Sequence, residues 1–564
     1  SVFSVLSVFN FKKPIFATMA LSLAFCLAAS ASAQAGRVIP NAPPADLPVT
    51  GEIELPRPPA VPSADQGPAH FFIQEYRVKG AHHLSRMEIE EAVYPFLGPG
   101  RTNADIEEAR RALEQAYHAK GYDAVLVEIP RQKVQNGVIY LQVVEATVGR
   151  LRVRGARYFS PNQIKAQAPS LAEGKVVNFN DVPHDIVALN QWPDRQVTPT
   201  MTQGAVPGTV DIDLNVKDTL PLHASLELNN QYSADTTPLR LNGSVTDNNL
   251  WQLGHSANFS FQVAPQHLSN AEVFSGYYLV HVPSVEGLSL MVQGTRQDSD
   301  VSTLGGAAVT GRGSILGVRA NFTLPASKNF YDSVSLGLDY KHFDQDIIVN
   351  GSDTASPVTY YPLSANYSAT LFGAGCSTEF NAGITFHLRG LGSTSAGFDN
   401  SKFGAGGSFI YFRGDLSHTH ELPGKLQIFG KIQGQIADQP LLSSEQFSAG
   451  GLETVRGYLE GEVPGDNAFC TSLELRSPSL VSWLGQKTGE WRVYVFNDSG
   501  WVTNNSPVLP EEASRFTLES FGVGSRIQLL DHFTGSIDAA VPLTSQSTTQ
   551  AHEIRLTFRA GIDY

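Results

Sequence analysis

From Thr219 to Tyr564, apolar and polar residues alternate in one segment after another. The clearest alternation covers residues 224–228, 257–263, 334–340 and 426–436. Because successive side chains of a strand point to opposite sides of its sheet, this period predicts strands with one apolar and one polar face. Strands of about 10 residues are long enough to span a membrane, and the region has room for about 16 of them. The pattern predicts a transmembrane antiparallel β-barrel over residues 218–564.

The last alternating segment separates its two faces most clearly. Arg555, Arg559 and Asp563 lie on one face, where contact with lipid would be costly. We therefore expect that face to line a water-filled lumen. A soluble β-sandwich is the alternative, but it accounts poorly for alternation sustained over so long a region. The opposite face carries only apolar or aromatic residues: Ile554, Leu556, Phe558, Ala560, Ile562 and Tyr564.

Ahead of the barrel, the pattern predicts two small α+β modules, at residues 71–146 and 147–217. In the first, a strand at 72–79 precedes a helix that Ser85 and Glu88 begin as a capping box. A second helix, at 104–120, has its apolar residues at helical spacing and Gly121 as its C-cap. Strands at 123–129 and 138–144 complete the module. The order strand, helix, helix, strand, strand then recurs at 148–154, 161–168, 180–191, 195–202 and 209–216.

The first 70 residues predict a targeting segment followed by a tether. Lys12 and Lys13 precede an apolar run, which ends near the small-residue cleavage pattern Ala31-Ser32-Ala33. This arrangement is typical of a secretory signal peptide, here residues 1–35; an N-terminal membrane anchor would need a longer apolar run. Residues 36–70 are rich in proline, which favours an extended linker.

Composition narrows the possible functions. The formal net charge of -14 and the pI near 5.5 argue against a nucleic-acid-binding protein. Beyond the N-terminal stretch, no apolar run is long enough for a membrane-spanning helix. Cys376 and Cys470 lie too far apart in sequence for a metal motif, and their pairing is left open.

Two short motifs occur within the barrel region. Val455-Arg456-Gly457-Tyr458 follows a glycine-containing stretch, and Phe496-Asn497-Asp498-Ser499-Gly500 follows a strand pattern that begins at Trp491. In a strand, Phe496, Asp498 and Gly500 share one face, while Val493 and Val495 lie on the other, which suits lipid. Asp498 is therefore expected to point into the lumen.

These features resemble two-partner secretion transporters, the TpsB or hemolysin secretion/activation type of the POTRA-containing outer-membrane superfamily. In the modules, the resemblance rests on 78–80, Gly121-Tyr122, Glu145 and 189–194; in the barrel, it rests on the VRGY and F-x-D-x-G motifs. It implies two POTRA domains in the periplasm that bind an unfolded exoprotein, and a 16-strand pore in the bacterial outer membrane. It also implies a long loop, at 443–470, folded back into a porin-like pore.

The resemblance implies a specific contact within the pore. Arg456 on the loop is expected to pair with Asp498 on the wall, because a guanidinium can hold a carboxylate through two parallel hydrogen bonds. Gly457 would let the loop turn, and Gly500 would leave room on the wall. Three further residues are expected to support the pair by packing: Val455, Tyr458 and Phe496. The alternative is an exposed Arg456 paired with water.

The expected partners are a large, β-helical secreted exoprotein and the lipids of the outer membrane, with no nucleic acid. An outer-membrane assembly factor, which shares the loop, is an alternative function; a passive porin or receptor is another, and the tandem modules disfavour it. Asp498-Ser499-Gly500 resembles the surroundings of a protease nucleophile, but Ser499 lies in a strand without the supporting motifs. His418 and His420 share a strand face but have no third ligand nearby. We expect no enzyme, no metal and no cofactor.

Overall fold

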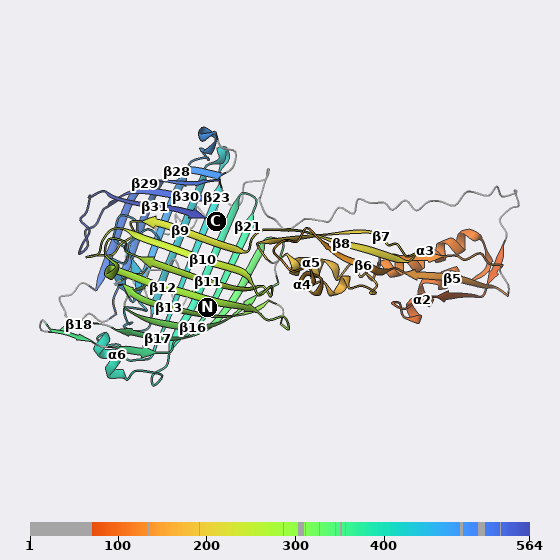
Figure 1. Ribbon diagram of the computed structural model, residues 1–564, viewed down its shortest axis with the longest axis horizontal. Helices are drawn as coiled ribbons and strands as arrows, with labels where there is room; N and C mark the ends of the chain where they lie inside the picture. Colours follow the sequence, from red (N-terminus) through yellow and green to blue (C-terminus); the bar gives the residue numbers. More distant parts are fainter. Residues whose placement is uncertain are drawn as a thin grey trace, which may run out of the picture. The chain divides into compact units, whose positions relative to one another are not determined.

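The computed structural model describes residues 70–564 except 134–135, 191, 286, 300, 303–308, 311, 326, 345, 350–351, 356, 486–488, 506–513 and 531. The expected signal peptide (1–35) and, apart from its last residue, the expected linker (36–70) lie outside the described residues. The chain forms two compact units, one containing two α/β modules and the other a barrel (Figure 1). Within the described part of the chain, no helix is long and apolar enough to cross a membrane.

The first module is a three-stranded sheet covered by two helices. The sheet has the order β2-β5-β4, with β2 and β5 parallel. The capping box is confirmed, since the Ser85 hydroxyl and the Glu88 carboxylate each accept the other residue's backbone N–H. Its elements are β1 (Phe71–Ile73), β2 (Glu75–Lys79), α2 (Arg86–Val93), β3 (Gly98–Arg101), α3 (Asn103–His118), β4 (Val125–Glu128) and β5 (Val138–Glu145).

Two local expectations for this module were wrong. The strand expected at 72–79 is interrupted at Gln74, and its first part, β1, pairs with β3 rather than with the main sheet. The C-cap of α3 is Ala119, and Gly121 adopts a left-handed conformation (φ 86°) two residues later. The helix face itself is as predicted: Ile106, Ala109, Leu113 and Tyr117 are buried.

Glu145, at the end of β5, joins the sheet of this module to its helices. Its carboxylate accepts hydrogen bonds from the backbone N–H groups of His82 (2.7 Å) and His83 (3.0 Å) and from the Tyr117 hydroxyl (2.8 Å). Burial alone would raise the pKa of Glu145, but these hydrogen bonds outweigh burial and hold the pKa below its ordinary value of 4.5. The carboxylate is therefore a stabilising charge in the folded module.

The first module should lose stability in acid. A carboxyl whose pKa is lower in the folded chain stabilises the fold above its unfolded pKa and loses that contribution as the pH falls through its folded pKa. In the intact protein, protection of the α3 amides against hydrogen exchange should decline progressively below pH 4.5. Glu145→Gln should be less protected at neutral pH and less sensitive to acid. An unchanged pH dependence in this variant would contradict the assignment.

The second module repeats the first. Its sheet has the order β6-β8-β7. In both three-stranded sheets the last strand lies at the centre: β5 is parallel to β2, and β8 is parallel to β6. Val148, Ile164, Leu189 and Ile212 belong to its buried core. Its elements are β6 (Thr147–Arg154), α4 (Pro161–Ala166), α5 (Val182–Leu189), β7 (Arg195–Gln203) and β8 (Thr209–Asp218).

The second unit is a closed antiparallel barrel. Because β20 and β21 both pair with β17, they form one interrupted strand, and the described residues therefore contain 16 barrel strands. The strands are β9 (Leu222–Asn229), β10 (Arg240–Leu250), β11 (His255–Val263), β12 (Ala271–His281), β13 (Leu288–Ser299), β16 (Arg312–Thr323), β17 (Phe330–Asp344), β20 (Val358–Tyr360), β21 (Leu363–Gly373), β22 (Cys376–His387), β23 (Phe409–Glu421), β24 (Gln427–Ala437), β27 (Asn467–Arg476), β28 (Gly489–Thr503), β29 (Arg515–Leu529), β30 (Phe533–Pro542) and β31 (Arg555–Asp563).

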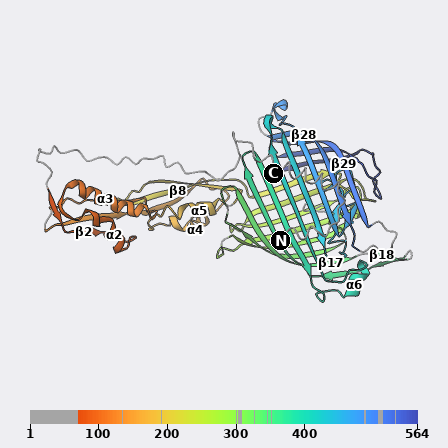
Figure 2. The ribbon, with the colours of Figure 1, turned by 180° about the vertical axis from the view of Figure 1, so that it is seen from behind.

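The last strand closes the barrel against the first. In this seam, β31 pairs with β9 from Arg559 opposite Asn229 to Asp563 opposite Ser225. Figure 2 shows the common tilt of the strands on the far side. Short additional elements lie in the loops: β14 (Val301–Ser302), β15 (Val309–Thr310), β18 (Asp346–Val349), β19 (Ser352–Ala355) and α6 (Ser395–Ser401).

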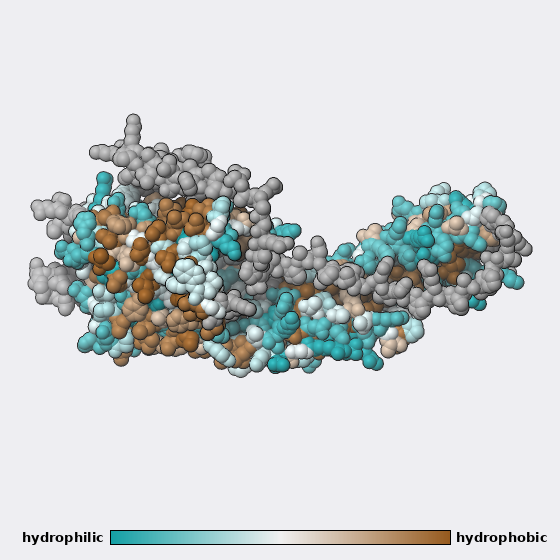
Figure 3. Space-filling model, turned by 90° about the horizontal axis from the view of Figure 1, so that it is seen from above, coloured by the Kyte–Doolittle hydropathy of each residue, from teal (hydrophilic) through white to brown (hydrophobic). Residues whose placement is uncertain are grey.

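The alternation predicted from the sequence sorts the side chains as expected. Leu226, Leu556 and Ile562 are exposed on the outer surface, where apolar side chains gather over the barrel strands (Figure 3). On the inner face, the Arg559 guanidinium donates to Glu227 across the seam at 2.9 Å. An apolar outer surface around a polar interior is the arrangement that a lipid bilayer requires.

Candidate functional site: the loop inside the barrel

The longest buried connection inside the barrel joins β24 to β27. Residues 438–466 form it and include a short antiparallel hairpin of β25 (Phe447–Ala449) and β26 (Val463–Gly465). The loop packs against the inner faces of the wall strands. Among its buried residues are Leu441, Leu442, Phe447, Ala449, Val455, Tyr458, Leu459 and Val463. The loop therefore occupies part of the lumen.

Arg456, in the far part of this loop, makes a two-pronged contact with Asp498. The guanidinium Nε donates to Asp498 Oδ2 at 2.7 Å, and Nη2 donates to Oδ1 at 2.8 Å. The backbone N–H of Arg456 also donates to Oδ2, at 3.1 Å. Arg456 is 5% exposed and Asp498 1%. The guanidinium is thus buried against the inner face of the wall, in contact with a carboxylate.

Two further carboxylates approach the same guanidinium. Arg456 Nη1 donates to Glu474 Oε1 at 2.6 Å and lies 3.7 Å from Asp538 Oδ1. Glu474 is also paired with Arg476, at 2.7 Å. Such shared contacts make a buried charge network, in which removing one member leaves the others without compensation.

Aromatic rings complete the surroundings of the guanidinium. Its central carbon lies 3.5 Å from the centroid of the Phe496 ring and 5.9 Å from that of Tyr494. A planar guanidinium stacks favourably on an aromatic face while its edge remains free for hydrogen bonds. Burial alone would lower the pKa of Arg456, but Asp498 and Glu474 outweigh burial and raise it above its usual range. The side chain therefore carries its charge permanently.

The neighbours of Arg456 fix the rest of the motif. The buried Tyr458 hydroxyl donates to the carbonyl of Thr544 (2.8 Å) and contacts that of Glu519 (3.0 Å). Gly457 has a φ of 93°, and a Cβ there would lie 3.2 Å from Ala540 Cβ. Both observations favour glycine at that position.

Gly500 leaves space on the wall. A Cβ at Gly500 would lie only 2.8 Å from Cγ2 of Val455, whose side chain is fully buried. The structure thus brings all seven predicted site residues together: Val455, Arg456, Gly457, Tyr458, Phe496, Asp498 and Gly500.

The chain matches known protein families over most of its described length. The family described as haemolysin secretion/activation protein ShlB/FhaC/HecB matches residues 208–527, more than half of the chain. The chain belongs to this family. Residues 71–146 match the ShlB-type POTRA domain.

Relatives of the haemolysin secretion/activation family match over most of their length. The chain is 22% identical over 518 residues to the outer membrane transporter CdiB of Dickeya dadantii, covering 89% of this chain and 88% of that protein. It is 19% identical over 473 residues to the heme/hemopexin transporter protein HuxB of Haemophilus influenzae, covering 81% and 80%. The name of the first relative describes an outer-membrane transporter, and the name of the second describes a transporter for heme and hemopexin.

Solved structures share the fold. CdiB from Escherichia coli matches with a TM-score of 0.58 at 20% identity, covering 90% of this chain and 93% of that one. BamA from Haemophilus ducreyi, lacking POTRA domains 1–3, matches with a TM-score of 0.53 at 16% identity, covering 88% and 100%. Identities this low establish the fold alone.

The function of the whole protein follows from its family. The chain is an outer-membrane transporter of the two-partner secretion type, which exports a partner exoprotein. Its barrel lies in the outer membrane and its POTRA domains lie in the periplasm.

Two charged residues of the site were not predicted. Glu474 and Asp538 were missed because they lie on strands without a recognisable motif. Parity could have indicated Glu474, since it shares a strand face with Ser472 and Cys470. Strand parity could not show that Glu474 lies close to Arg456, because that distance depends on the path of the loop.

The structure also describes the residues that the sequence analysis considered for other sites. The rings of His418 and His420 stack along β23 with centroids 5.9 Å apart. Within the described residues, no three His, Cys, Asp or Glu side chains gather in a way that could hold a metal ion. Cys376 and Cys470 are both free thiols. Ser499 lies within β28, as expected from its strand context.

Proposed function

We propose that the loop at 438–466 is a lid, and that Arg456 and Asp498 are the lock that holds it inside the pore at rest. The observation that supports the lock is the two-pronged, fully buried contact between these two side chains. Opening the pore would separate them. Each charge would then need another partner or water, so the closed state would be strongly favoured until a client displaces the lid.

We also propose the domain boundaries that the sequence suggests. Residues 1–35 would be a signal peptide, 36–70 a linker, 71–146 and 147–217 the two POTRA domains, and 218–564 the barrel. The POTRA sheets would receive the unfolded exoprotein through main-chain hydrogen bonds at a sheet edge, a mode that demands little side-chain specificity. The client would be large and β-helical, outer-membrane lipids would surround the barrel, and the chain would act without catalysis.

The lock can be tested by measuring ion conductance through the purified protein in planar bilayers. Breaking a buried ion pair by removing one partner costs about 3–5 kcal/mol. Since every 1.4 kcal/mol is tenfold, Arg456→Ala should raise the fraction of open channels by at least about a hundredfold, or until all are open. Arg456→Lys keeps the charge but not the two-pronged geometry, so its conductance should be intermediate. Wild-type conductance in the Ala variant would contradict the lock.

A further inference from the structure

The near part of the loop is fastened to the wall independently of Arg456. We call residues 438–449 and 463–466 the root and residues 450–462 the tip. The Glu445 carboxylate in the root is 1% exposed and pairs with Lys341 at 2.5 Å. It also accepts hydrogen bonds from the hydroxyls of Tyr360 (2.5 Å) and Tyr411 (2.8 Å). These partners belong to β17, β20 and β23, so one root side chain joins three segments of the wall.

The charge on Glu445 is stable in this position. Burial alone would raise its pKa, but Lys341 and the two tyrosine hydroxyls outweigh burial and hold the pKa below its ordinary value. Tyr360 and Tyr411 also belong to an apolar cluster that includes Leu441 and Leu442 of the root. The first arm of the root is therefore held by charge and by apolar packing together.

Asp466 fastens the second arm of the root. Its buried carboxylate accepts hydrogen bonds from the backbone N–H of Leu441 (2.9 Å), the Gln446 amide (3.0 Å) and the backbone N–H of Asn505 (2.8 Å). The first two donors lie in the first arm, and Asn505 follows wall strand β28. The two arms are thus tied to each other and to the barrel.

Glycines join the root to the tip. Gly450 and Gly451 have φ values of 103° and 105°, and Gly461 on the returning arm has a φ of 64°. Gly461 N–H donates to the Gly450 carbonyl at 3.2 Å, so the two arms meet at this neck. Because glycine has no Cβ, its backbone can change conformation more readily than that of other residues. The neck is the part of the loop best suited to bend.

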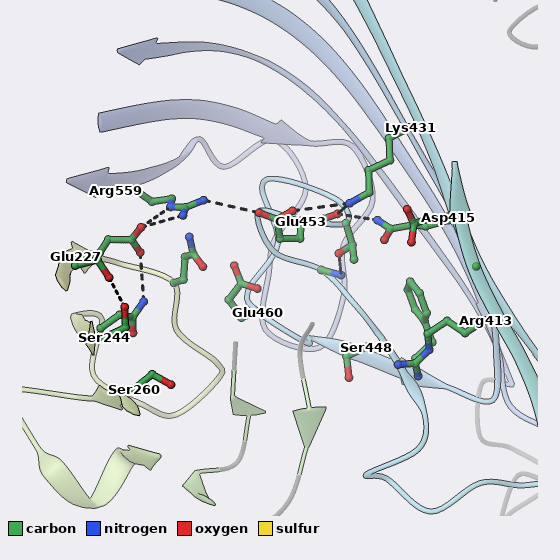
Figure 4. Close-up of a pocket in the computed structure, with 18 of the residues that line it drawn as sticks. Glu227, Ser244, Ser260, Arg413, Asp415, Lys431, Ser448, Glu453, Glu460 and Arg559 are labelled. Atoms are coloured by element: carbon green, nitrogen blue, oxygen red, sulfur yellow. Dashed lines mark hydrogen bonds and ion pairs between the residues drawn. The ribbon is translucent and has the colours of Figure 1, made fainter. Parts of the chain in front are cut away.

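The tip borders open space. A cavity of about 480 Å³ lies beside it, lined by Glu453 and Glu460 of the tip and by Glu227 and Arg559 of the barrel seam (Figure 4). Across the cavity, Glu453 lies 3.8 Å from both Lys431 and Arg559. Glu453 is half exposed, and exposed ion pairs of this kind contribute little. Movement of the tip on this side would break these weak ion pairs and two hydrogen bonds to the Glu453 carbonyl, from Gln433 Nε2 at 2.7 Å and from Lys431 Nζ at 3.3 Å.

We propose that Glu445 is a positioning residue of the transporter, which keeps the root as a fixed part of the wall while only the tip, residues 450–462, moves about the glycine neck to open the pore. This inference rests on the proposed lid. It predicts that the root remains in place during secretion. The passage would then run beside the root, along the wall that contains the cavity.

Two engineered disulfides to the same wall strand can distinguish movement of the tip from movement of the root. Val455 of the tip contacts Gly500, and Gly465 of the root contacts Val502; both wall residues lie on β28. One protein carries Val455→Cys with Gly500→Cys, and a second carries Gly465→Cys with Val502→Cys. The contacts are close enough for a disulfide. Cys26, Cys376 and Cys470 are replaced by alanine in both proteins, because Cys470 Sγ would lie 3.3 Å from a Cβ at 500.

Secretion is compared between the oxidised and reduced forms of each protein in cells, and disulfide formation is measured by thiol labelling. The oxidised tip pair should export far less than its own reduced form, which is the reference because Val455 and Gly500 belong to the candidate site. The oxidised root pair should export as well as its reduced form. A block by the root disulfide, or failure of the root cysteines to pair, would overturn the fixed root. Normal export with the tip disulfide formed would instead overturn the lid itself, so the two failures are distinguishable.

A second test addresses Glu445 directly. Lys341→Met leaves a buried carboxylate without its cation, and should lower secretion per folded barrel by roughly tenfold. Lys341→Met combined with Glu445→Gln removes both charges and should recover most of that loss, since a buried pair can be replaced by neutral groups at little cost. The folded barrel is counted by its heat-modifiable mobility on gels. Equal secretion by the single and double variants would contradict a positioning role for the pair.

Discussion

Replacement of Arg456 by alanine should lower secretion of the partner exoprotein by roughly tenfold or more, while the barrel still inserts in the outer membrane. The variant leaves Asp498 and Glu474 buried without the guanidinium that now bridges them at 2.7 and 2.6 Å. Carboxylates in such a site repel each other and draw in water, so the tip of the loop loses its defined resting position. Asp498→Ala should have a similar effect. Secretion is measured as exoprotein in the medium per folded barrel.

The barrel offers a matched control for this experiment. Arg319 also holds a carboxylate through two hydrogen bonds, to Asp339 at 2.7 and 2.9 Å, but both residues belong to wall strands. Arg319→Ala removes the same group from the same kind of contact without touching the loop. It should retain most of the secretion. If it abolishes secretion as Arg456→Ala does, the effect reflects general damage to the barrel rather than release of the lid.

An arginine on the outer surface should destabilise the barrel itself. Val318 lies in the middle of β16, is 51% exposed, and pairs with Val292 and Leu338 on the outer face. At the bilayer midplane, a lipid-facing arginine costs about 2–4 kcal/mol. Val318→Arg should therefore lower the free energy of unfolding by about this amount, which urea titration of the protein in lipid vesicles can measure.

The control variant places the same charge on the other face of the same strand. Asn321 has the parity of Arg319, whose side chain pairs with Asp339 inside the barrel. Asn321→Arg should change the stability much less, because the new charge meets water. Equal destabilisation by both variants would mean that the outer face of β16 does not contact lipid.

Local patterns made much of the fold predictable. The capping box at Ser85 and the buried face of α3 follow from interactions within a few residues, and the structure has both. The alternation in β31 was equally reliable, because side-chain direction in a strand depends only on parity. The end of α3 was misplaced, since the sequence marks a helix boundary less sharply than it marks a buried face.

The part of the candidate site that belongs to the two sequence motifs could be predicted. Arg456 and Asp498 were found by the motifs and by strand parity, and the structure places them in contact. Their role as a lock stays a prediction. The ion pair of Glu445 with Lys341 was not predicted, because the two residues lie 104 positions apart in the sequence. No periodicity links positions so far apart, so only the barrel wall brings them together.

The sequence by itself determined which side chains face outward and which face the lumen, because that choice follows from a period of two and from the cost that a bilayer would impose on an outward charge. It also indicated the two repeated modules and the motifs that contain Arg456 and Asp498, which the structure brings into contact. The tertiary structure alone decided the closure of β31 on β9, the path of the loop through the lumen, and the partners gathered around Arg456 and Glu445. These depend on strand register and on contacts between distant residues, which a one-dimensional pattern does not specify.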